Sequence, residues 1–596
     1  MSSQLLATVY SRARQPHRGA ILVLAVIAGV APFLVQDPAG AATYHVGGAG
    51  CTHPTIAAAL LSAAFSPEDD LIILTRTVSY TNVQLTLTNW NPATTGTLTL
   101  AGGVDDCGGL TFSGTTTLAG NGSDPVITVS TTASQVSNVT LSRLRIHGGS
   151  RGLDVSGDSE VGLFNSELYA NGTGLRVTSG GRVEIDTFVG IHDNSGALFG
   201  GGIHCADPTS EVTLHGVVYS NQATSAGGGI FASNFCQLNL AEGGYVQSNA
   251  APLGGGIYLQ TGARMDGGGG AIYGARVTGN IASNAGGGFY IQGASGGARA
   301  TLSSVLIDDN TAANLGGGVA LVGGGLMDLE RSSASSNCPS PPRCASLSGN
   351  SLSAGGLGSA AYVAGGSHLT LAHAFIEQNS GPGEAGFVLF AEGAGSAMSL
   401  EGVQLWDNRT VSLFQAENAA HIEAGFVSAA RNDYLIGGVP PYWNSRGAQA
   451  SGGATVEIFT SILDDQRPFT TTTGGIVNVG CVLLDTLDGA TIFSNTMVGA
   501  DPRFLNAAAG NLRLRLDSPA IDSCNEEVYA PVYLDLDLEQ RGFDFTSIPN
   551  ILGPYDRGAD EIRPLFADGF ESGDPSQWSS TVPCAQALES GACAAP

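Results

Sequence analysis

Lysine is absent from this chain of 596 residues, and all 24 of its basic residues are arginine. The 51 acidic residues leave a formal net charge of −27 at pH 7. A protein that binds nucleic acid needs a stripe of basic side chains to neutralise phosphates, and the sequence shows none. No lysine follows any glycine run, which argues against a phosphate-cradling loop as well. We therefore expect no nucleic-acid partner.

Charged residues are also scarce, at 13% of the chain against about a quarter in a typical domain. Apolar residues reach 43%, and glycine, with 86 residues, has about twice its usual share. A disordered polymer would show the opposite balance of charged and apolar residues. The composition therefore predicts a folded chain.

The N-terminus has the pattern of a targeting segment. Three arginines up to residue 18 precede an apolar stretch over residues 19–35, and residues 39–41 read Ala-Gly-Ala, which suits signal cleavage. A retained membrane anchor is the alternative, but the apolar stretch is short for a bilayer and Pro32 interrupts it. We interpret residues 1–41 as a signal peptide. After its removal we expect an exported protein without a membrane span.

An asparagine followed eight residues later by a glycine recurs through the middle of the chain. Gly202, Gly229 and Gly256 are spaced 27 residues apart, which is about one coil of a parallel β-helix. The glycines up to Gly318 each close a run of three and precede an apolar residue. The pairs are Asn194/Gly202, Asn221/Gly229, Asn280/Gly288 and Asn310/Gly318, with a shorter Asn249/Gly256 and a weaker Asn350/Gly358.

The residues around each asparagine predict how the coils stack. Asparagine tolerates tight turns and can bond its counterparts above and below, so we expect the stacked copies to form an internal ladder. Alternation after the glycine run, as in Ile257-Tyr258-Leu259, is typical of a strand whose outer residues face the core. We expect about 15 coils in a rod of roughly 70 Å. Apolar residues stand three places before each asparagine: Ile191, Val218, Val246, Val277, Ile307, Leu347, Ile376 and Leu405.

Ten cysteines, an even number, fit an oxidising compartment. Because the coils of a solenoid contact only their neighbours, we expect sequential cysteines to pair. A zinc site is the competing interpretation, and no CxxC or Cys/His cluster supports it. The expected disulfides are Cys51–Cys107, Cys205–Cys236, Cys338–Cys344, Cys481–Cys524 and Cys584–Cys593.

The open ends of a solenoid expose core residues and strand edges, so both ends need covering elements. Alanine and leucine over residues 55–65 predict a short helix that serves this purpose at the N-terminal end. At the C-terminal end, acidic residues and arginines around turns suit a cap that ion-pairs over the last coil. The expected division is an N-terminal cap at 42–68, a β-helix at 69–500, a C-terminal cap at 501–563 and a polar tail at 564–596.

Two parts of the chain resemble known families. The Asn…Gly-Gly-Gly-(Ile/Phe/Val) repeats over about 190–410 resemble those of polymorphic outer-membrane proteins, with a third glycine in place of an alanine. Residues 512–561 resemble the choice-of-anchor Q domain through the stretch Ser518–Asp522 (SPAID) and the turn Asp556–Glu561 (DRGADE). These resemblances imply a bacterial, exported, right-handed parallel β-helix of the pectin lyase-like kind. They place it at the outer-membrane surface or outside a Gram-negative cell, and they imply no catalytic site.

β-Helix enzymes that cleave acidic polysaccharides are the alternative. A hydrolase would need two or three carboxylates on one face, with an arginine or histidine to hold sugar acids. The adjacent pairs Asp105-Asp106, Asp308-Asp309 and Asp464-Asp465 lie many coils apart and cannot form one site. A lyase would need clustered aspartates to bind calcium and a basic residue to abstract a proton, and the sequence shows no convincing cluster. Calcium-binding repeats of the Gly-Gly-x-Gly-x-Asp type are a separate possibility, and the glycine runs lack their aspartate. We assign no catalytic, metal-binding or cofactor-binding residue, and no cofactor, to this chain.

One row of aromatic side chains is a candidate ligand-binding feature. Phe231, Tyr258 and Tyr290 should point outward on successive coils, with His204 one coil earlier. Such a row can stack on sugar rings or dock a partner, although stacking that only stabilises neighbouring strands is commoner. We expect a monomeric, adhesin-like interaction protein whose partner is a polysaccharide or a surface protein. The alternatives are a polysaccharide lyase or glycoside hydrolase, and a purely structural scaffold.

Overall fold

The computed structural model describes residues 42–563 with a number of internal gaps. The expected signal peptide, the polar tail and the pairs Cys338–Cys344 and Cys584–Cys593 lie outside the described residues. The gaps are residues 49, 91–95, 109–110, 132–135, 269–273, 295, 333–344, 382–385, 433–445, 465–468, 487–488, 526–533 and 545–547.

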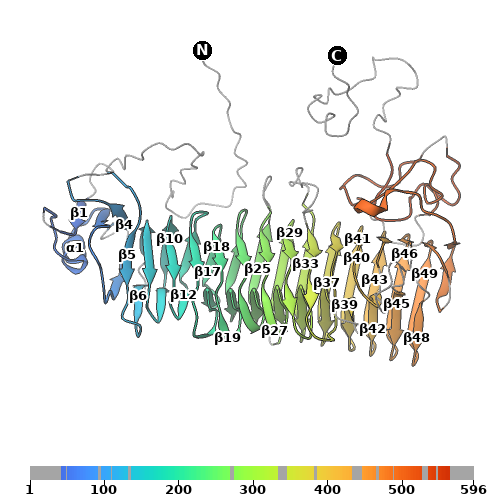
Figure 1. Ribbon diagram of the computed structural model, residues 1–596, viewed down its shortest axis with the longest axis horizontal. Coiled ribbons are helices and arrows are strands. Elements are labelled where there is room, and N and C mark those ends of the chain that lie inside the picture. Colours follow the sequence, from blue (N-terminus) through green and yellow to red (C-terminus); the bar gives the residue numbers. More distant parts are fainter. Residues whose placement is uncertain are drawn as a thin grey trace, which may run out of the picture.

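The described strands wind into a long rod of parallel sheets (Figure 1). Three sheets follow the rod, with 17, 15 and 14 strands, and we call them sheets A, B and C in that order. One coil passes through β10 (Ser159–Phe164) of sheet A, β11 (Glu167–Tyr169) of sheet B and β12 (Thr173–Thr178) of sheet C. The predicted all-β fold, a right-handed parallel β-helix, is confirmed, and the 15 strands of sheet B agree with the expected number of coils.

A short helix covers the N-terminal end of the rod (Figure 1). Helix α1 (Ile56–Ala63) begins after Thr55, whose side chain accepts a hydrogen bond from the Ala58 amide. Its buried face packs against β1 (Ala42–Val46) and β2 (Asp70–Thr75), which pair in parallel. The helix expected over residues 55–65 is therefore present, and it shields the first rung of the core.

Alternating side chains of each strand fill one continuous core that runs from Val46 to Leu484. In sheet C, β20 (Ile230–Ser233), β24 (Ile257–Gln260) and β28 (Phe289–Gln292) align so that Ile230, Ile257 and Phe289 lie directly above one another. These residues are fully or almost fully buried, as the period-two alternation predicted.

A ladder of ten asparagines follows one corner of the described coils, between sheets B and C. At Asn221, the backbone N–H and the side-chain Nδ2 both donate to Oδ1 of Asn249, each at 3.0 Å, and Nδ2 also donates to the Ile191 carbonyl at 2.8 Å. The predicted internal ladder is confirmed and extends beyond the predicted repeats. Its members are Asn171, Asn194, Asn221, Asn249, Asn280, Asn310, Asn350, Asn379, Asn408 and Asn432.

Six coils carry an additional short strand after the ladder corner. These strands form sheet D, which lies between sheets B and C along the chain. The sequence analysis did not predict this sheet, because its strands are short and rich in alanine, threonine and serine. Its strands are β15 (Ala197–Phe199), β19 (Ala223–Ala226), β23 (Ala250–Leu253), β27 (Ile281–Ala285), β31 (Thr311–Ala312) and β35 (Ser351–Leu352).

The three glycines that follow the sheet D strands from β15 to β31 meet three different constraints, as β19 shows. Gly227 has φ +64°, which favours glycine. A Cβ on Gly228 would lie 2.5 Å from the backbone of Ala250, one coil further on. A Cβ on Gly229 would lie 2.9 Å from Nδ2 of the ladder residue Asn249. The glycine run therefore lets the backbone make a tight turn while it packs directly against the ladder asparagine and the backbone of the next coil.

Three of the expected disulfides lie within the described residues and are confirmed: Cys51–Cys107, Cys205–Cys236 and Cys481–Cys524. Each joins sequential cysteines, with Cα atoms 5.1 to 6.0 Å apart. The third bond attaches the segment beyond residue 501 to the solenoid, since Cys524 lies in that segment and Cys481 in a late coil.

The C-terminal segment, residues 501–563, lies along the side of the rod (Figure 1). Trp406 donates from Nε1 to the Ala507 carbonyl at 2.8 Å, and Arg331 donates from Nη1 to the Leu536 carbonyl at 2.7 Å. The segment thus reaches back over several coils, whereas the sequence analysis placed its ion pairs over the last coil. The segment lies there because the outer face of sheet B is uncharged at several positions in these coils and can pack against it. These positions are Phe375, Ser428, Ala430, Ile462 and Leu483.

Candidate functional site

A step forms on the rod where sheet D begins. In the coil before it, β11 ends at Tyr169 and β12 begins only four residues later at Thr173. In the next coil, β14 (Gly190–His192) and β16 (Ile203–Ala206) are separated by β15 and a glycine run. The chain therefore bulges outward at β15, which has a strand partner on one side, β19.

A pocket of about 430 Å³ lies at the foot of this step. We call it the step pocket. Its walls come from sheet C on one side and from the edge of β15 on the other. Its lining residues are Ser150, Arg151, Gly172, Thr173, Arg176, Gly196, Ala197, Leu198, Phe199 and His204.

Two arginines of the step pocket are held by one buried carboxylate. Asp154, on β9 (Arg151–Ser156), is only 5% exposed. Arg176 lies beside it on β12 and donates from Nε and Nη2 to its two carboxylate oxygens at 2.8 and 2.9 Å. Arg151 donates from Nη1 to Oδ2 of the same carboxylate at 3.1 Å. Charge-assisted bonds of this kind fix the two guanidinium groups before any ligand arrives.

His204 continues the same column of side chains, opposite Arg176 in the next strand. Its ring contacts the ring of Phe231 edge to face at 5.2 Å. Burial, helped by the positive charges of Arg176 and Arg151, lowers the pKa of His204 to about 4 against the opposing effect of Asp154 and Asp207. The imidazole is therefore neutral at neutral pH and offers one donor and one acceptor.

The other wall of the step pocket is apolar. Leu198 is 57% exposed, although it is a large hydrophobic residue. Phe199 stacks on Phe231 with ring centroids 4.7 Å apart. The pocket thus sets an aliphatic and aromatic wall against a wall of guanidinium, imidazole and hydroxyl groups.

The predicted aromatic row lies on the outer side of sheet C, as expected. Phe231, Tyr258 and Tyr290 stack with centroid distances of 5.4 and 5.1 Å. Sheet D residues such as Ala226 and Leu253 pack over the rings, so that Phe231 is 3% and Tyr258 is 5% exposed. Ligand binding by the rings themselves stays a prediction, and their burial leaves most of their area covered. The step pocket lies at the N-terminal end of this row, where Phe199 and His204 contact Phe231 and also line the pocket.

A second aromatic column escaped the sequence analysis. His147, Tyr169, His192 and Tyr219 stack on the outer face of sheet B, with centroids 4.9, 5.5 and 4.6 Å apart. Three of them stand two places before a ladder asparagine, and that recurring position is the signal by which sequence could have found them.

A shallow trough of about 270 Å³ lies on the outer face of sheet A. Across β10, β13 (Arg182–Ile185) and β17 (Glu211–Leu214), the register places Glu160, Arg182 and Glu211 side by side, with Glu184 next to them. At about 4.8 Å per strand, Glu160 and Glu211 are roughly 10 Å apart at their backbones. Sequence reasoning missed this group because its three glutamates are single acids spaced more than 20 residues apart.

The adjacent acid pairs noted in the sequence lie elsewhere. Asp105 forms an ion pair with Arg76 near the N-terminal end, with Nε of Arg76 2.6 Å from Oδ1 of Asp105. Asp308 is paired with Arg276 on sheet B, and it accepts a further bond from Thr278 at 3.2 Å. Asp465 is outside the described residues. Asp105 and Asp308 therefore belong to separate ion pairs, and the structure does not bring the described acid pairs together.

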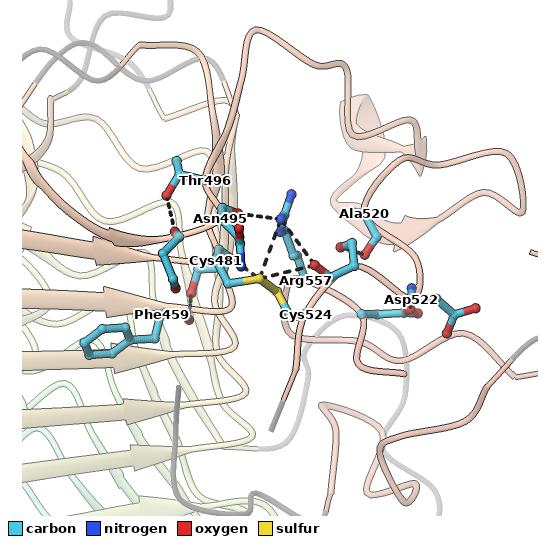
Figure 2. Close-up of a disulfide and its surroundings, with 12 residues drawn as sticks. Phe459, Cys481, Asn495, Thr496, Ala520, Asp522, Cys524 and Arg557 are labelled. Carbon is cyan, nitrogen blue, oxygen red and sulfur yellow. Dashed lines mark hydrogen bonds between the residues drawn. A yellow bond between two sulfur atoms is a disulfide. The ribbon is translucent and has the colours of Figure 1, made fainter. Parts of the chain in front are cut away.

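Buried charges in the C-terminal segment bind backbone groups of the segment itself and of the end of the solenoid. Glu561 accepts from the Gly542 and Phe543 amides at 2.8 and 2.9 Å. Arg557 donates from Nη2 to the Asn495 carbonyl at 2.8 Å, beside the Cys481–Cys524 disulfide (Figure 2). The Asp556–Glu561 turn noted in the sequence thus closes the segment against the rod, and its charges serve the fold.

No family model matches the chain, and no curated protein matches it. The resemblances to polymorphic outer-membrane proteins and to the choice-of-anchor Q domain therefore rest on their motifs alone. Among the helices that the structure describes, none is long and apolar enough to cross a membrane. The described residues also contain no group of three or more histidine, cysteine, aspartate or glutamate side chains placed to hold a metal ion.

Replacing His204 by glutamine should reduce the loss of stability in acid. Because the folded-state pKa of His204 is about 4 and the unfolded value is near 6.5, the unfolded chain binds a proton first as the pH falls. This residue therefore destabilises the fold progressively from about pH 6.5 down to pH 4, by about 2 kcal/mol after allowance for its partial exposure. The fall in Tm from pH 6.5 to 4.5 should be smaller in H204Q than in wild type. Equal falls would contradict the buried, neutral imidazole.

Proposed function

We propose that the protein is exported, acts at or outside the outer membrane as an adhesin-like binding protein, and holds a glycan in the step pocket. The signal-like residues 1–41, the acidic composition and the disulfides support export. The rod carries the pocket on its side, where a long polymer can approach without entering a closed cavity.

The observation that carries the proposal is the pairing of two unlike walls in the step pocket. A sugar ring has an apolar face and a rim of hydroxyl groups. Leu198 and Phe199 suit the apolar face, while Arg176, His204 and Thr173 supply hydrogen-bonding groups for the rim. Binding sites for small ligands commonly combine an apolar lining with a few polar groups that fix orientation.

Replacing Leu198 by aspartate should abolish retention of glycans without loss of fold. A charged side chain on the apolar wall would lose the contact with the sugar face and require desolvation on binding. A matched control exists on the same sheet, because Ile281 of β27 is 56% exposed, close to the 57% of Leu198, and does not line the pocket. We expect mature wild type and I281D to bind the same members of a glycan array, and L198D to bind none of them. Unchanged binding by L198D would refute the site, and no binding by wild type would favour the scaffold interpretation.

The trough on sheet A supports a second candidate function, a glycoside hydrolase. Hydrolases use two carboxylates on opposite sides of the scissile bond, with an arginine or histidine to hold acidic sugars. Glu160, Glu184 and Glu211 with Arg182 provide these residue types on one strand face. Incubation with polygalacturonate and alginate distinguishes the two candidates. New reducing ends would support a hydrolase, unsaturated products a lyase, and intact polymer the binding role.

A further inference from the structure

We infer that the step pocket takes a sugar that carries an anionic group, a carboxylate or a sulfate ester, and that Arg151 and Arg176 bind this group. The inference rests on the proposed glycan-binding function and names the class of glycan. Neither arginine was singled out by the sequence, since they lie 25 residues apart and only the coil brings them together.

The charge of the pocket is the first argument. The chain has a formal net charge of −27, and every basic residue is an arginine. Nevertheless, the residues that line the step pocket include two arginines and no acid. Asp154, which neutralises one of these charges, is buried behind them, and Asp207 lies outside the lining. The lining is therefore locally positive on an acidic molecule, which attracts an anion and repels a cation.

The hydrogen-bonding atoms of the two arginines are the second argument. Arg176 engages Asp154 through Nε and Nη2, and Arg151 engages it through Nη1. The remaining guanidinium nitrogens, Nη1 of Arg176 and Nε and Nη2 of Arg151, are not used by the aspartate. Each arginine side chain is about a third exposed. Guanidinium groups held in this way bind carboxylate or sulfate oxygens with little loss of side-chain entropy.

The apolar wall is the third argument, because it distinguishes a sugar acid from a free inorganic ion. An inorganic anion would be bound by the arginines alone and would leave Leu198 and Phe199 in water. A sugar ring that bears the anionic group on one side can cover both residues. The neutral His204 and the Thr173 hydroxyl group are placed to contact the ring hydroxyls.

Calorimetric titration of the mature protein with three matched trisaccharides tests this inference. The probes are trigalacturonate, the neutral galactose trisaccharide and its sulfated form. We expect at least one anionic probe to bind about tenfold or more tightly than the neutral one, since hydrogen bonds between charged groups exceed neutral ones by this order. Arg151→Gln should remove most of the difference, because Arg176 keeps its paired bonds to Asp154 while one charge is lost. Arg264→Gln, on an exposed arginine of sheet A, is the matched control and should change nothing.

A salt titration of the wild-type protein gives a measurement that does not depend on how the variants fold. Raising the salt concentration should weaken binding of the anionic probe and leave the neutral probe unaffected. Equal affinity for anionic and neutral probes, with no effect of Arg151→Gln or salt, would overturn this inference and leave the proposed function standing. Binding of none of the probes, together with a blank glycan array, would overturn the proposed function itself. A preference for one anionic probe would assign the group as carboxylate or sulfate.

Discussion

Replacing Asn249 by alanine should cause the largest loss of stability of any single change considered for this protein. Oδ1 of Asn249 accepts two bonds from Asn221, and its Nδ2 donates to the Val218 carbonyl at 3.0 Å. Alanine would remove the partner of the Asn221 amide and of the Val218 carbonyl, at about 1–3 kcal/mol each. Nδ2 of Asn221 would keep only its bond to the Ile191 carbonyl. The two groups left without a partner and the weakened Asn221 Nδ2 together give about 3–6 kcal/mol, at or above the upper end of the usual range for point mutations.

Urea unfolding followed by circular dichroism checks this expectation. Asn239 is the matched control, because it is an exposed asparagine on β21 (Gln237–Leu240) of sheet A, in the same coil as Asn249 but outside the ladder. N239A should unfold within about 0.5 kcal/mol of wild type, as surface substitutions usually do. If N249A and N239A have the same midpoint and slope, the ladder contributes nothing to stability and the hydrogen-bond argument fails.

Replacing Gly228 by alanine is the second large effect. The added Cβ would lie 2.5 Å from the carbonyl carbon and oxygen of Ala250 and 2.5 Å from the Gly255 carbonyl oxygen. All of these atoms belong to the backbone, so no side-chain rotation relieves the overlap. The strands of two coils must separate at the position where the ladder requires them to touch. We expect a cost of about 3 kcal/mol or more, at the upper end of what overpacking causes.

The matched control for this change is Gly48→Ala, because a Cβ at Gly48 meets no atom within 4 Å. Wild type, G228A and G48A should be compared by Tm and by the yield of soluble protein. G48A should match wild type, while G228A should melt earlier or accumulate as insoluble protein. A soluble G228A with an unchanged Tm would mean that the coils are farther apart than the structure shows.

The sequence was sufficient for the solenoid because its strongest constraints recur at a fixed position. Each asparagine has to satisfy the one before it, so the residue type cannot vary along the ladder. Asn171 and Asn432, at the two ends of the ladder, were not predicted, although Leu168 and Ala429 stand three places before them, as the repeat requires. The disulfide Cys205–Cys236 was also predictable, since only neighbouring coils can be joined.

The step pocket could not be predicted, because it arises from a difference between two coils. Arg151, Arg176 and His204 come from three successive strands, and no local pattern marks them as neighbours. Their meeting depends on the register of sheet C and on the coil at which β15 first appears. The burial of Phe231 and Tyr258 was equally hidden, since it depends on sheet D packing over a face that alternation assigns to solvent.

The unequal spacing of the ladder residues has a consequence for how this molecule can change. Successive asparagines are separated by as few as 23 and as many as 40 residues, yet they remain bonded at about the same distance. The extra residues of the longer coils therefore lie at other corners, while the hydrogen bonds at this corner keep successive coils aligned. Insertions at those corners can build new surface features one coil at a time, without disturbing the coils on either side. Such a rod can gain or lose a recognition site through an insertion or deletion confined to one coil.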